Sequence, residues 1–123
     1  MAIRIQCLVI DSHDCPALAR FWAETLGWRV TYEDDHQSVV EPPEGSVELD
    51  VVPDLLFVKV LDDKTTKNRL HLDLRPTDQG ATVERLLALG ARPAEVGQSD
   101  DVRWTVLADP EENEFCVLPP LPI

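Results

Sequence analysis

The sequence has few cysteines, and they form no close pair. Its 123 residues include three, Cys7, Cys15 and Cys116, without a C-x-x-C spacing. An odd, widely spaced set argues against a disulfide framework and against a structural zinc site. Glycine-rich phosphate loops, H-E-x-x-H zinc motifs and G-x-S-x-G nucleophile elbows are missing as well. The common enzyme signatures therefore identify no chemistry for this chain.

Basic residues are scarce. Eleven Lys and Arg stand against 23 Asp and Glu, which gives a formal net charge of -12. Phosphate groups would be repelled, so we expect neither nucleic acid nor a membrane surface as a partner. The sequence also has no N-terminal basic-then-apolar leader and no run near the roughly 18 apolar residues of a membrane span. These absences predict a soluble cytoplasmic protein.

The most informative feature of the sequence is a repeated unit. Leu26-Gly27-Trp28-Arg29-Val30 and Leu89-Gly90-Ala91-Arg92-Pro93 lie about 63 residues apart, each after a helix-spaced apolar segment and before a strand-like run. The strand-like runs 3–10 and 70–75 precede the two helical segments. With 44% apolar residues, the chain is predicted to fold as one domain, 1–123. Its halves are module one, 1–62, and module two, 68–120, with a ligand cleft where they meet.

Periodicity predicts the order βαβββ twice, and hence an α+β fold. In module one we expect a strand covered on both faces, a helix ended by Gly27, and three further strands, at 3–10, 16–26, 28–33, 37–41 and 54–61. In module two the corresponding elements are predicted at 70–75, 79–89, 91–96, 102–108 and 114–118. The helices should bury Leu18, Phe21 and Trp22, and Val83, Leu86 and Leu87. His13 and His36 lie in turns and are expected to be exposed.

The run 70–75 has the clearest strand alternation. Leu70, Leu72 and Leu74 share one face, and His71, Asp73 and Arg75 share the other. We expect the leucines to face the helix and the polar residues to face the cleft. Asp73 and Arg75 either pair with each other or position a polar ligand.

Several segments together resemble the vicinal oxygen chelate superfamily. They are the two Leu-Gly joints, Phe21-Trp22, KNRLHLDLRP, VERLLALGA and the hairpin DPEENEFCVL. This group includes glyoxalase I, extradiol dioxygenases and bleomycin-resistance proteins. The resemblance implies paired βαβββ modules that form an open half-barrel sheet around a cavity. It also implies one divalent metal, held by the first and last strands of each module. Glu112 replaces the glycine usual in the hairpin and is expected to strain the turn.

When the ligand positions of the superfamily are carried over to this sequence one by one, the metal site that the resemblance implies is incomplete. His71 falls on a metal-binding histidine, but Cys7 and Cys116 fall on two of the other positions, and the fourth lies near Leu56 or Phe57 in an apolar run. The register of the first strand leaves Gln6, Cys7 or Leu8 facing the pocket. We therefore predict no cofactor, and binding of a divalent metal is the alternative.

The candidate residues are ligand-binding rather than catalytic: Cys7, His71, Asp73, Arg75, Trp104 and Cys116. Trp104 would be a stacking wall if the hairpin register places it on the face of Cys116. The two thiols either fill space, form a soft Cys₂His zinc site with His71, or supply a nucleophile beside it.

Three functions remain open. The first is a glyoxalase-like protein that acts on or sequesters a small metabolite or antibiotic without the usual complete metal site. The second is a metal-dependent lyase, isomerase or dioxygenase of the superfamily. The third is a dimerisation module with a collapsed pocket. A homodimer is expected, because a partner often completes the cleft in this group.

Overall fold

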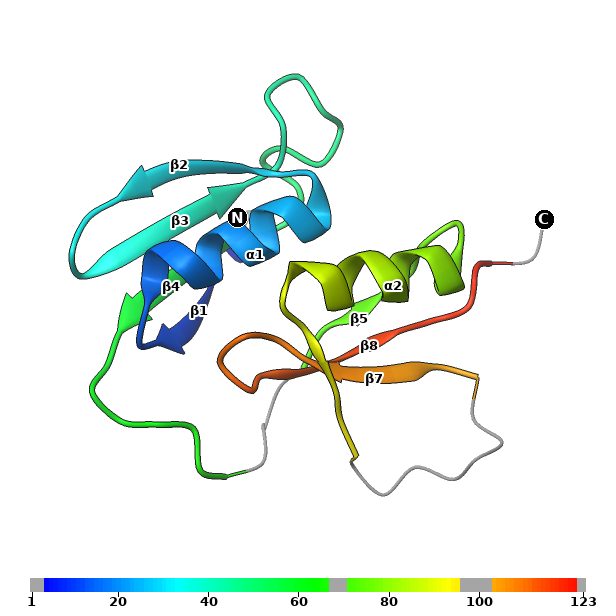
Figure 1. Ribbon diagram of the computed structural model, residues 1–123. Helices are drawn as coiled ribbons and strands as arrows, with labels where there is room; N and C mark the ends of the chain where they lie inside the picture. Colours follow the sequence, from blue (N-terminus) through cyan, green and yellow to red (C-terminus); the bar gives the residue numbers. More distant parts are fainter. Residues whose placement is uncertain (1–3, 67–70, 96–102, 122–123) are drawn as a thin grey trace. The chain divides into compact units, whose positions relative to one another are not determined.

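The chain folds into two βαβββ modules, shown in the computed structural model of Figure 1, which describes residues 4–66, 71–95 and 103–121. Contacts divide the chain into two compact units, Met1–Asp63 and Lys64–Ile123. Within the described residues, neither helix is long and apolar enough to cross a membrane.

In the first unit, one helix packs against a mixed sheet. The elements are β1 (Cys7–Ser12), α1 (Cys15–Leu26), β2 (Arg29–Glu33), β3 (Gln37–Glu41) and β4 (Asp54–Lys59). Among the described residues the sheet has four strands in the order β1-β4-β3-β2. β1 runs parallel to β4, and the other neighbours are antiparallel. The connection between the parallel strands β1 and β4 comprises α1, β2 and β3, and so provides the long crossover that a parallel pair requires.

Local chemistry sets both ends of α1. The Asp14 carboxylate accepts a hydrogen bond from the Ala17 backbone N–H at 3.1 Å, and Pro16 stands in the first turn. Gly27 ends the helix in the left-handed conformation at φ 69°. The predicted inward residues Leu18, Phe21 and Trp22 are buried, together with Val40, Leu55 and Phe57 of the sheet.

The second unit repeats this arrangement. Its elements are β5 (Asp73–Leu74), α2 (Gln79–Leu89), β6 (Arg92–Pro93), β7 (Thr105–Ala108) and β8 (Glu114–Val117). The described strands form a four-stranded sheet in the order β5-β8-β7-β6, with β5 parallel to β8. Each strand therefore has the same neighbours as its counterpart in the first unit. The predicted order βαβββ–βαβββ is confirmed.

Helix α2 has the predicted bounds. Asp78 caps it by accepting from the Ala81 N–H at 3.0 Å, and Gly90 follows it at φ 119°. The Gln79 side chain ties its first turn to the strands, because its amide donates to the Val117 carbonyl at 3.0 Å. Leu86 is fully buried. The prediction that Leu87 also faces inward is wrong: it is 39% exposed.

Two first-strand predictions need correction. The run 3–10 was expected to be covered on both faces, but β1 covers Cys7–Ser12 and Val9 is 60% exposed. An open sheet face explains this, since α1 contacts β2, β3 and β4 and a sheet has two faces. Of the described part of the run 70–75, only Asp73–Leu74 is a strand, since only these two residues pair with β8. Leu70, and positions 96 and 102 of two other predicted strands, lie outside the described residues.

The β7–β8 hairpin is built around a buried carboxylate. Asp109 is fully buried and accepts hydrogen bonds from the backbone N–H groups of Glu111 and Asn113, at 2.9 and 3.0 Å. The Asn113 side-chain amide donates to it as well, at 2.9 Å. Glu112 adopts a positive φ of 71°, which residues other than glycine rarely do. The expected departure from ordinary turn geometry is present.

Candidate functional site

Strands β5 and β8 bring three chemically active side chains together in the second unit. Asp73 lies opposite Cys116 in the parallel pairing, and the Cys116 N–H donates to the Leu72 carbonyl at 2.9 Å. Alternation along the strand places His71 and Asp73 on the face opposite Leu72. An imidazole nitrogen, a carboxylate oxygen and the Cys116 Sγ all lie within 4.8 Å of one another.

The cluster combines an exposed polar pair with a buried thiol. His71 Nε2 lies 3.2 Å from Asp73 Oδ1, and about half of each side chain is exposed. Cys116 is only 9% exposed, between the buried residues Phe115 and Val117. Such a pair can hold a polar ligand atom or a proton, and the thiol beneath it is a soft nucleophile or packing group. We refer to these three residues as the β5–β8 cluster.

Two other predicted site residues lie in the same unit. Arg75 does not pair with Asp73; its Nη1 donates to the Pro119 carbonyl at 2.6 Å. Trp104 precedes β7 and is 43% exposed, two residues before Val106, which pairs with Cys116. Their roles in ligand binding stay predictions.

Cys7 belongs to the first unit. It is the first residue of β1, opposite Asp54, and is half buried. Burial raises the pKa of its thiol, and the nearby carboxylates of Asp54 and Glu41 raise that pKa further. Cys7 is therefore a poor nucleophile at neutral pH. Whether it faces the same cleft as the β5–β8 cluster stays a prediction.

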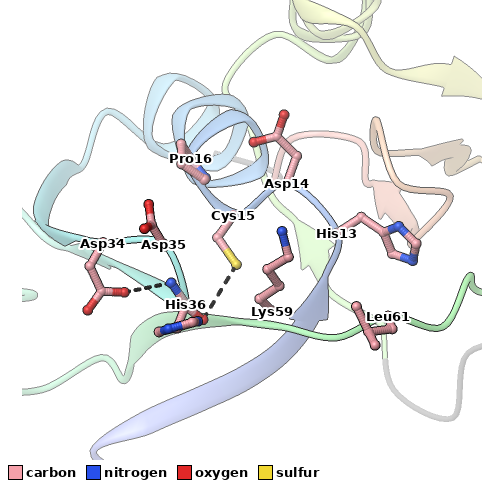
Figure 2. A pocket seen from close by; sticks show the side chains of 9 residues that line it. All are labelled: His13, Asp14, Cys15, Pro16, Asp34, Asp35, His36, Lys59 and Leu61. Carbon is pink, nitrogen blue, oxygen red and sulfur yellow. Dashed lines mark hydrogen bonds between the residues drawn. The ribbon is translucent and has the colours of Figure 1, made fainter.

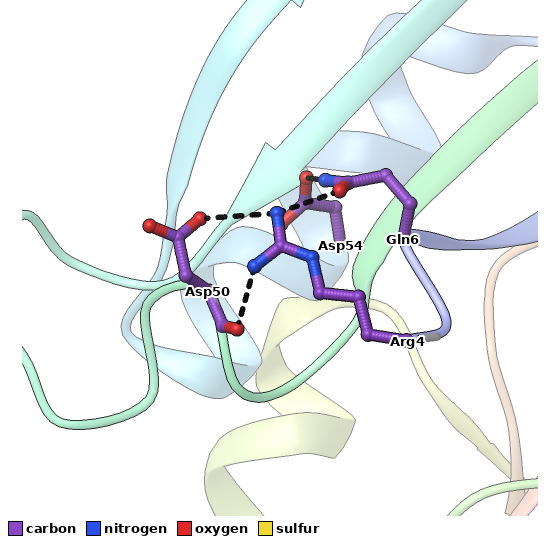
Figure 3. Close-up of polar contacts among 4 residues, drawn as sticks. All are labelled: Arg4, Gln6, Asp50 and Asp54. Carbon is purple, nitrogen blue, oxygen red and sulfur yellow. Dashed lines mark hydrogen bonds and ion pairs between the residues drawn. The ribbon is translucent and has the colours of Figure 1, made fainter. Parts of the chain in front are cut away.

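Figure 3 shows that the other candidate for the first-strand position, Gln6, is already engaged. Its side-chain oxygen accepts from Arg4 at 2.9 Å, and its amide donates to Asp54 at 3.1 Å. Arg4 also donates to the Asp50 carbonyl at 2.8 Å. Leu8 pairs with Leu55, which is buried. Paired residues of parallel strands share a face, so Leu8 lies on the helix-covered side and Cys7 on the open one.

Sequence reasoning missed an open pocket of about 800 Å³ in the first unit. Figure 2 shows its walls: the β1–α1 loop, the first turn of α1, the β2–β3 turn and the end of β4. They contribute His13, Asp14, Cys15, Pro16, Asp34, Asp35, His36, Lys59 and Leu61. His13 and His36 are exposed, as predicted. The missing signal was the parallel pairing of Ser12 with Lys59, which brings these distant turns to one edge of the sheet.

Much of the polar lining of this pocket has a structural role. Asp14 caps α1, and Asp34 accepts from the Tyr32 hydroxyl at 2.6 Å and from the His36 N–H at 2.8 Å. The Tyr32 hydrogen bond, followed by that of the His36 N–H, holds the pKa of Asp34 below its usual range. His13 Nε2 lies 2.7 Å from the Asp62 carbonyl oxygen. These contacts stabilise the turns, so we place the candidate site at the β5–β8 cluster.

A family model for the glyoxalase-like domain matches residues 7–118. The chain belongs to the glyoxalase-like domain family. This confirms the resemblance inferred from the sequence, and the α+β fold of two four-stranded mixed sheets matches the vicinal oxygen chelate fold. A search of curated protein sequences found no match.

Solved structures of similar fold come from several bacteria. A glyoxalase/bleomycin resistance protein/dioxygenase family enzyme from Burkholderia phytofirmans has a TM-score of 0.68 at 16% identity, covering 94% of this chain and 98% of that one. A glyoxalase-related enzyme from Fulvimarina pelagi has a TM-score of 0.66 at 15% identity, covering 94% and 87%. The bleomycin-binding protein of Streptomyces verticillus, solved with copper(II)-bleomycin, has a TM-score of 0.61 at 19% identity, covering 98% and 99%. At these identities the likeness shows the fold alone.

The donor atoms do not fit the metal that the superfamily resemblance implies. The resemblance implies histidine and carboxylate ligands from both modules, but it places His71, Cys7, Cys116 and the apolar Leu56 or Phe57 at those positions. Asp73 adds one carboxylate, but it is already 3.2 Å from the His71 Nε2 atom. One imidazole, one carboxylate and one soft thiol differ from the set of histidines and carboxylates that the resemblance implies.

Proposed function

We propose that this glyoxalase-like protein binds and sequesters a small molecule at the β5–β8 cluster, without the metal of its superfamily. The observation that carries the proposal is the convergence of the His71, Asp73 and Cys116 side chains within 4.8 Å, on the strand face opposite Leu72. A few convergent polar groups in a largely apolar setting are typical of ligand sites. Buried Val106, which pairs with Cys116 and shares its face of the sheet, supplies part of the apolar setting.

Charge narrows the ligand class. The net charge of -12 attracts cations and repels anions over distances of about 10 Å at 0.1 M salt. A neutral or cationic ligand therefore meets the protein more readily than an anionic metabolite does. Because the structural relative from Streptomyces verticillus was solved with copper(II)-bleomycin, an antibiotic of that kind is the natural probe.

The test compares bleomycin binding in three proteins by calorimetry: the unmodified chain, His71→Ala, and His36→Ala as a control at an exposed histidine of the first unit. We expect metal-free or copper-loaded bleomycin to bind the unmodified chain and the control equally, and His71→Ala at least tenfold more weakly. Absence of binding to both forms of bleomycin contradicts an antibiotic of this kind as the ligand. Binding that His71→Ala leaves unchanged contradicts the site.

A metal-dependent lyase, isomerase or dioxygenase is the competing proposal. The closeness of three donor types in the β5–β8 cluster favours it, and the incomplete donor set opposes it. Binding of bleomycin only after a divalent ion has bound to the protein would support this alternative.

We also propose that the protein is a homodimer in which a second copy covers open sheet surface. Val9 of β1 and Tyr32 of β2 are exposed, at 60% and 49%, and strand pairing through Leu56 and Val39 places both in one row on the same sheet face. Sedimentation equilibrium at micromolar concentration should give twice the 13.8 kDa chain mass. A mass of one chain at all concentrations would contradict the dimer. It would support neither the metal-free binding site nor the metal-dependent enzyme.

A further inference from the structure

The β5–β8 cluster contains the three groups of a thiol nucleophile with its base. His71 lies beside both Cys116 and Asp73, with all three functional atoms within 4.8 Å. Asp73 Oδ1 is 3.2 Å from His71 Nε2. A carboxylate at one ring nitrogen keeps the proton there and leaves the other nitrogen as the base. A thiol, an imidazole and a carboxylate are the three groups that together activate a weak nucleophile.

We propose that the β5–β8 cluster makes Cys116 a reactive thiol that captures small α,β-unsaturated carbonyl compounds by conjugate addition. The proposal rests on the small-molecule site proposed above and names the ligand class and the bond formed. A thiolate sulfur is a soft nucleophile and favours the soft β-carbon of such an acceptor. Because Cys116 is 9% exposed, only small, flat acceptors should reach its sulfur.

The step needs no external oxidant or cofactor. The Cys116 thiol gives its proton to the His71 imidazole, and its sulfur forms a bond to the β-carbon. The π electron pair of the carbon–carbon double bond moves toward the carbonyl to give an enolate. His71 then returns the proton, which ends on the α-carbon. The net change is addition of S–H across the double bond, and Asp73 stabilises the imidazolium that exists between the two proton transfers.

The other cysteines provide internal controls in the same molecule. Cys7 is more exposed than Cys116 but lies beside the carboxylates of Asp54 and Glu41, which disfavour its thiolate. Cys15 is 2% exposed, and its Sγ lies 4.0 Å from the His36 carbonyl oxygen. If exposure alone controlled reaction, Cys7 would react first. If the β5–β8 cluster activates its thiol, Cys116 reacts first despite its burial.

The experiment measures the rate at which N-ethylmaleimide, a small unsaturated imide, modifies each cysteine of the folded protein, by mass spectrometry of peptides after quenching. We expect Cys116 to react faster than Cys7 and Cys15. In His71→Ala the Cys116 rate should fall by about 10²-fold, the lower range for a positioned base. Free imidazole should restore part of that rate, which it could not do if His71 were only structural. His36→Ala should leave the Cys116 rate unchanged.

Asp73 is argued to act through His71, so its test uses a conservative variant. Asp73→Asn should slow the Cys116 reaction, and Asp73→Glu should recover part of it. Thermal melts of each variant identify any protein that fails to fold, and His71→Asn then replaces His71→Ala. A Cys116 rate no higher than that of Cys7, or one that His71 variants leave unchanged, overturns the proposal. Bleomycin binding measured on the same samples separates this failure from failure of the binding site itself.

Discussion

The strained turn at Glu112 gives the sharpest stability prediction, because one position combines two opposing effects. Its φ of 71° is a conformation in which a residue other than glycine costs about 1–2 kcal/mol. Its carboxylate pairs with Arg92, but both side chains are more than half exposed, so the pair contributes at most about 1 kcal/mol. Replacing Glu112 by glycine relieves the strain and loses the pair. Replacing it by alanine loses the pair and keeps the strain.

The difference between the two variants therefore isolates the backbone effect. After allowing for the larger chain entropy of unfolded glycine, we expect Glu112→Gly to be more stable than Glu112→Ala by about 1 kcal/mol. In a protein of this size that is a difference in Tm of about 4 °C. Urea denaturation followed by circular dichroism measures the free energy of unfolding of both variants under the same conditions.

A matched pair of substitutions in α1 controls for the intrinsic cost of glycine. Glu24 is exposed within the helix, where glycine is less stable than alanine by about 1 kcal/mol. The order of stability should thus be reversed between position 112 and position 24. If alanine is as stable as glycine at both positions, or more stable, residue 112 does not hold the left-handed conformation in solution and the reasoning fails.

Four further predictions concern two titrating carboxylates, the site compared with the core, and the net charge. At neutral pH, Asp54→Asn should raise the Tm, because burial and the Glu41 charge disfavour the Asp54 carboxylate and raise its pKa. This gain in Tm should vanish below the unfolded pKa near 3.9, where Asp54 is protonated in both the folded and the unfolded state. Asp34→Asn should lower the Tm at neutral pH, because the hydrogen bonds from Tyr32 and the His36 N–H stabilise the Asp34 carboxylate and so lower its pKa. This stabilisation is present above the unfolded pKa near 3.9 and is lost as the pH falls through the lower folded pKa. Melts from pH 3 to 8 would contradict both if the signs were reversed. His71→Ala should change stability by less than about 0.5 kcal/mol, whereas Leu86→Ala should cost about 2–5 kcal/mol; equal losses would make His71 a core residue. The unmodified protein should show no micromolar binding to DNA in an anisotropy titration at physiological salt, and such binding would contradict the charge argument.

The elements with strong local signals could be predicted from the sequence. Helix α2 and strand β3 have the predicted bounds, because capping residues and alternation are encoded locally. Strand β5 is shorter than its alternation predicted, since strand length depends on pairing with a partner, and only two of its residues pair with β8. The exposure of Leu87 and Val9 likewise depends on what covers a surface, and periodicity does not carry that information.

The candidate site could be predicted in part for the same reason. Alternation in 70–75 placed His71 and Asp73 on one face, but only the parallel register of β5 with β8 brings Cys116 opposite Asp73. The engagement of Arg75 by the Pro119 carbonyl depends on the path of the C-terminal segment. The pocket near His13 and His36 depends on turns far apart in the sequence meeting at one sheet edge. The single half-barrel formed by both modules stays a prediction.

We propose that this glyoxalase-like protein works without the divalent metal of its superfamily. The decisive measurement for this proposal is calorimetric titration of zinc, nickel, manganese and iron(II) into protein purified free of metal, with His71→Ala titrated in parallel. The incomplete donor set predicts no stoichiometric binding in the sub-micromolar range that depends on His71. Tight, one-to-one binding of any of these ions that is lost in His71→Ala would contradict the account.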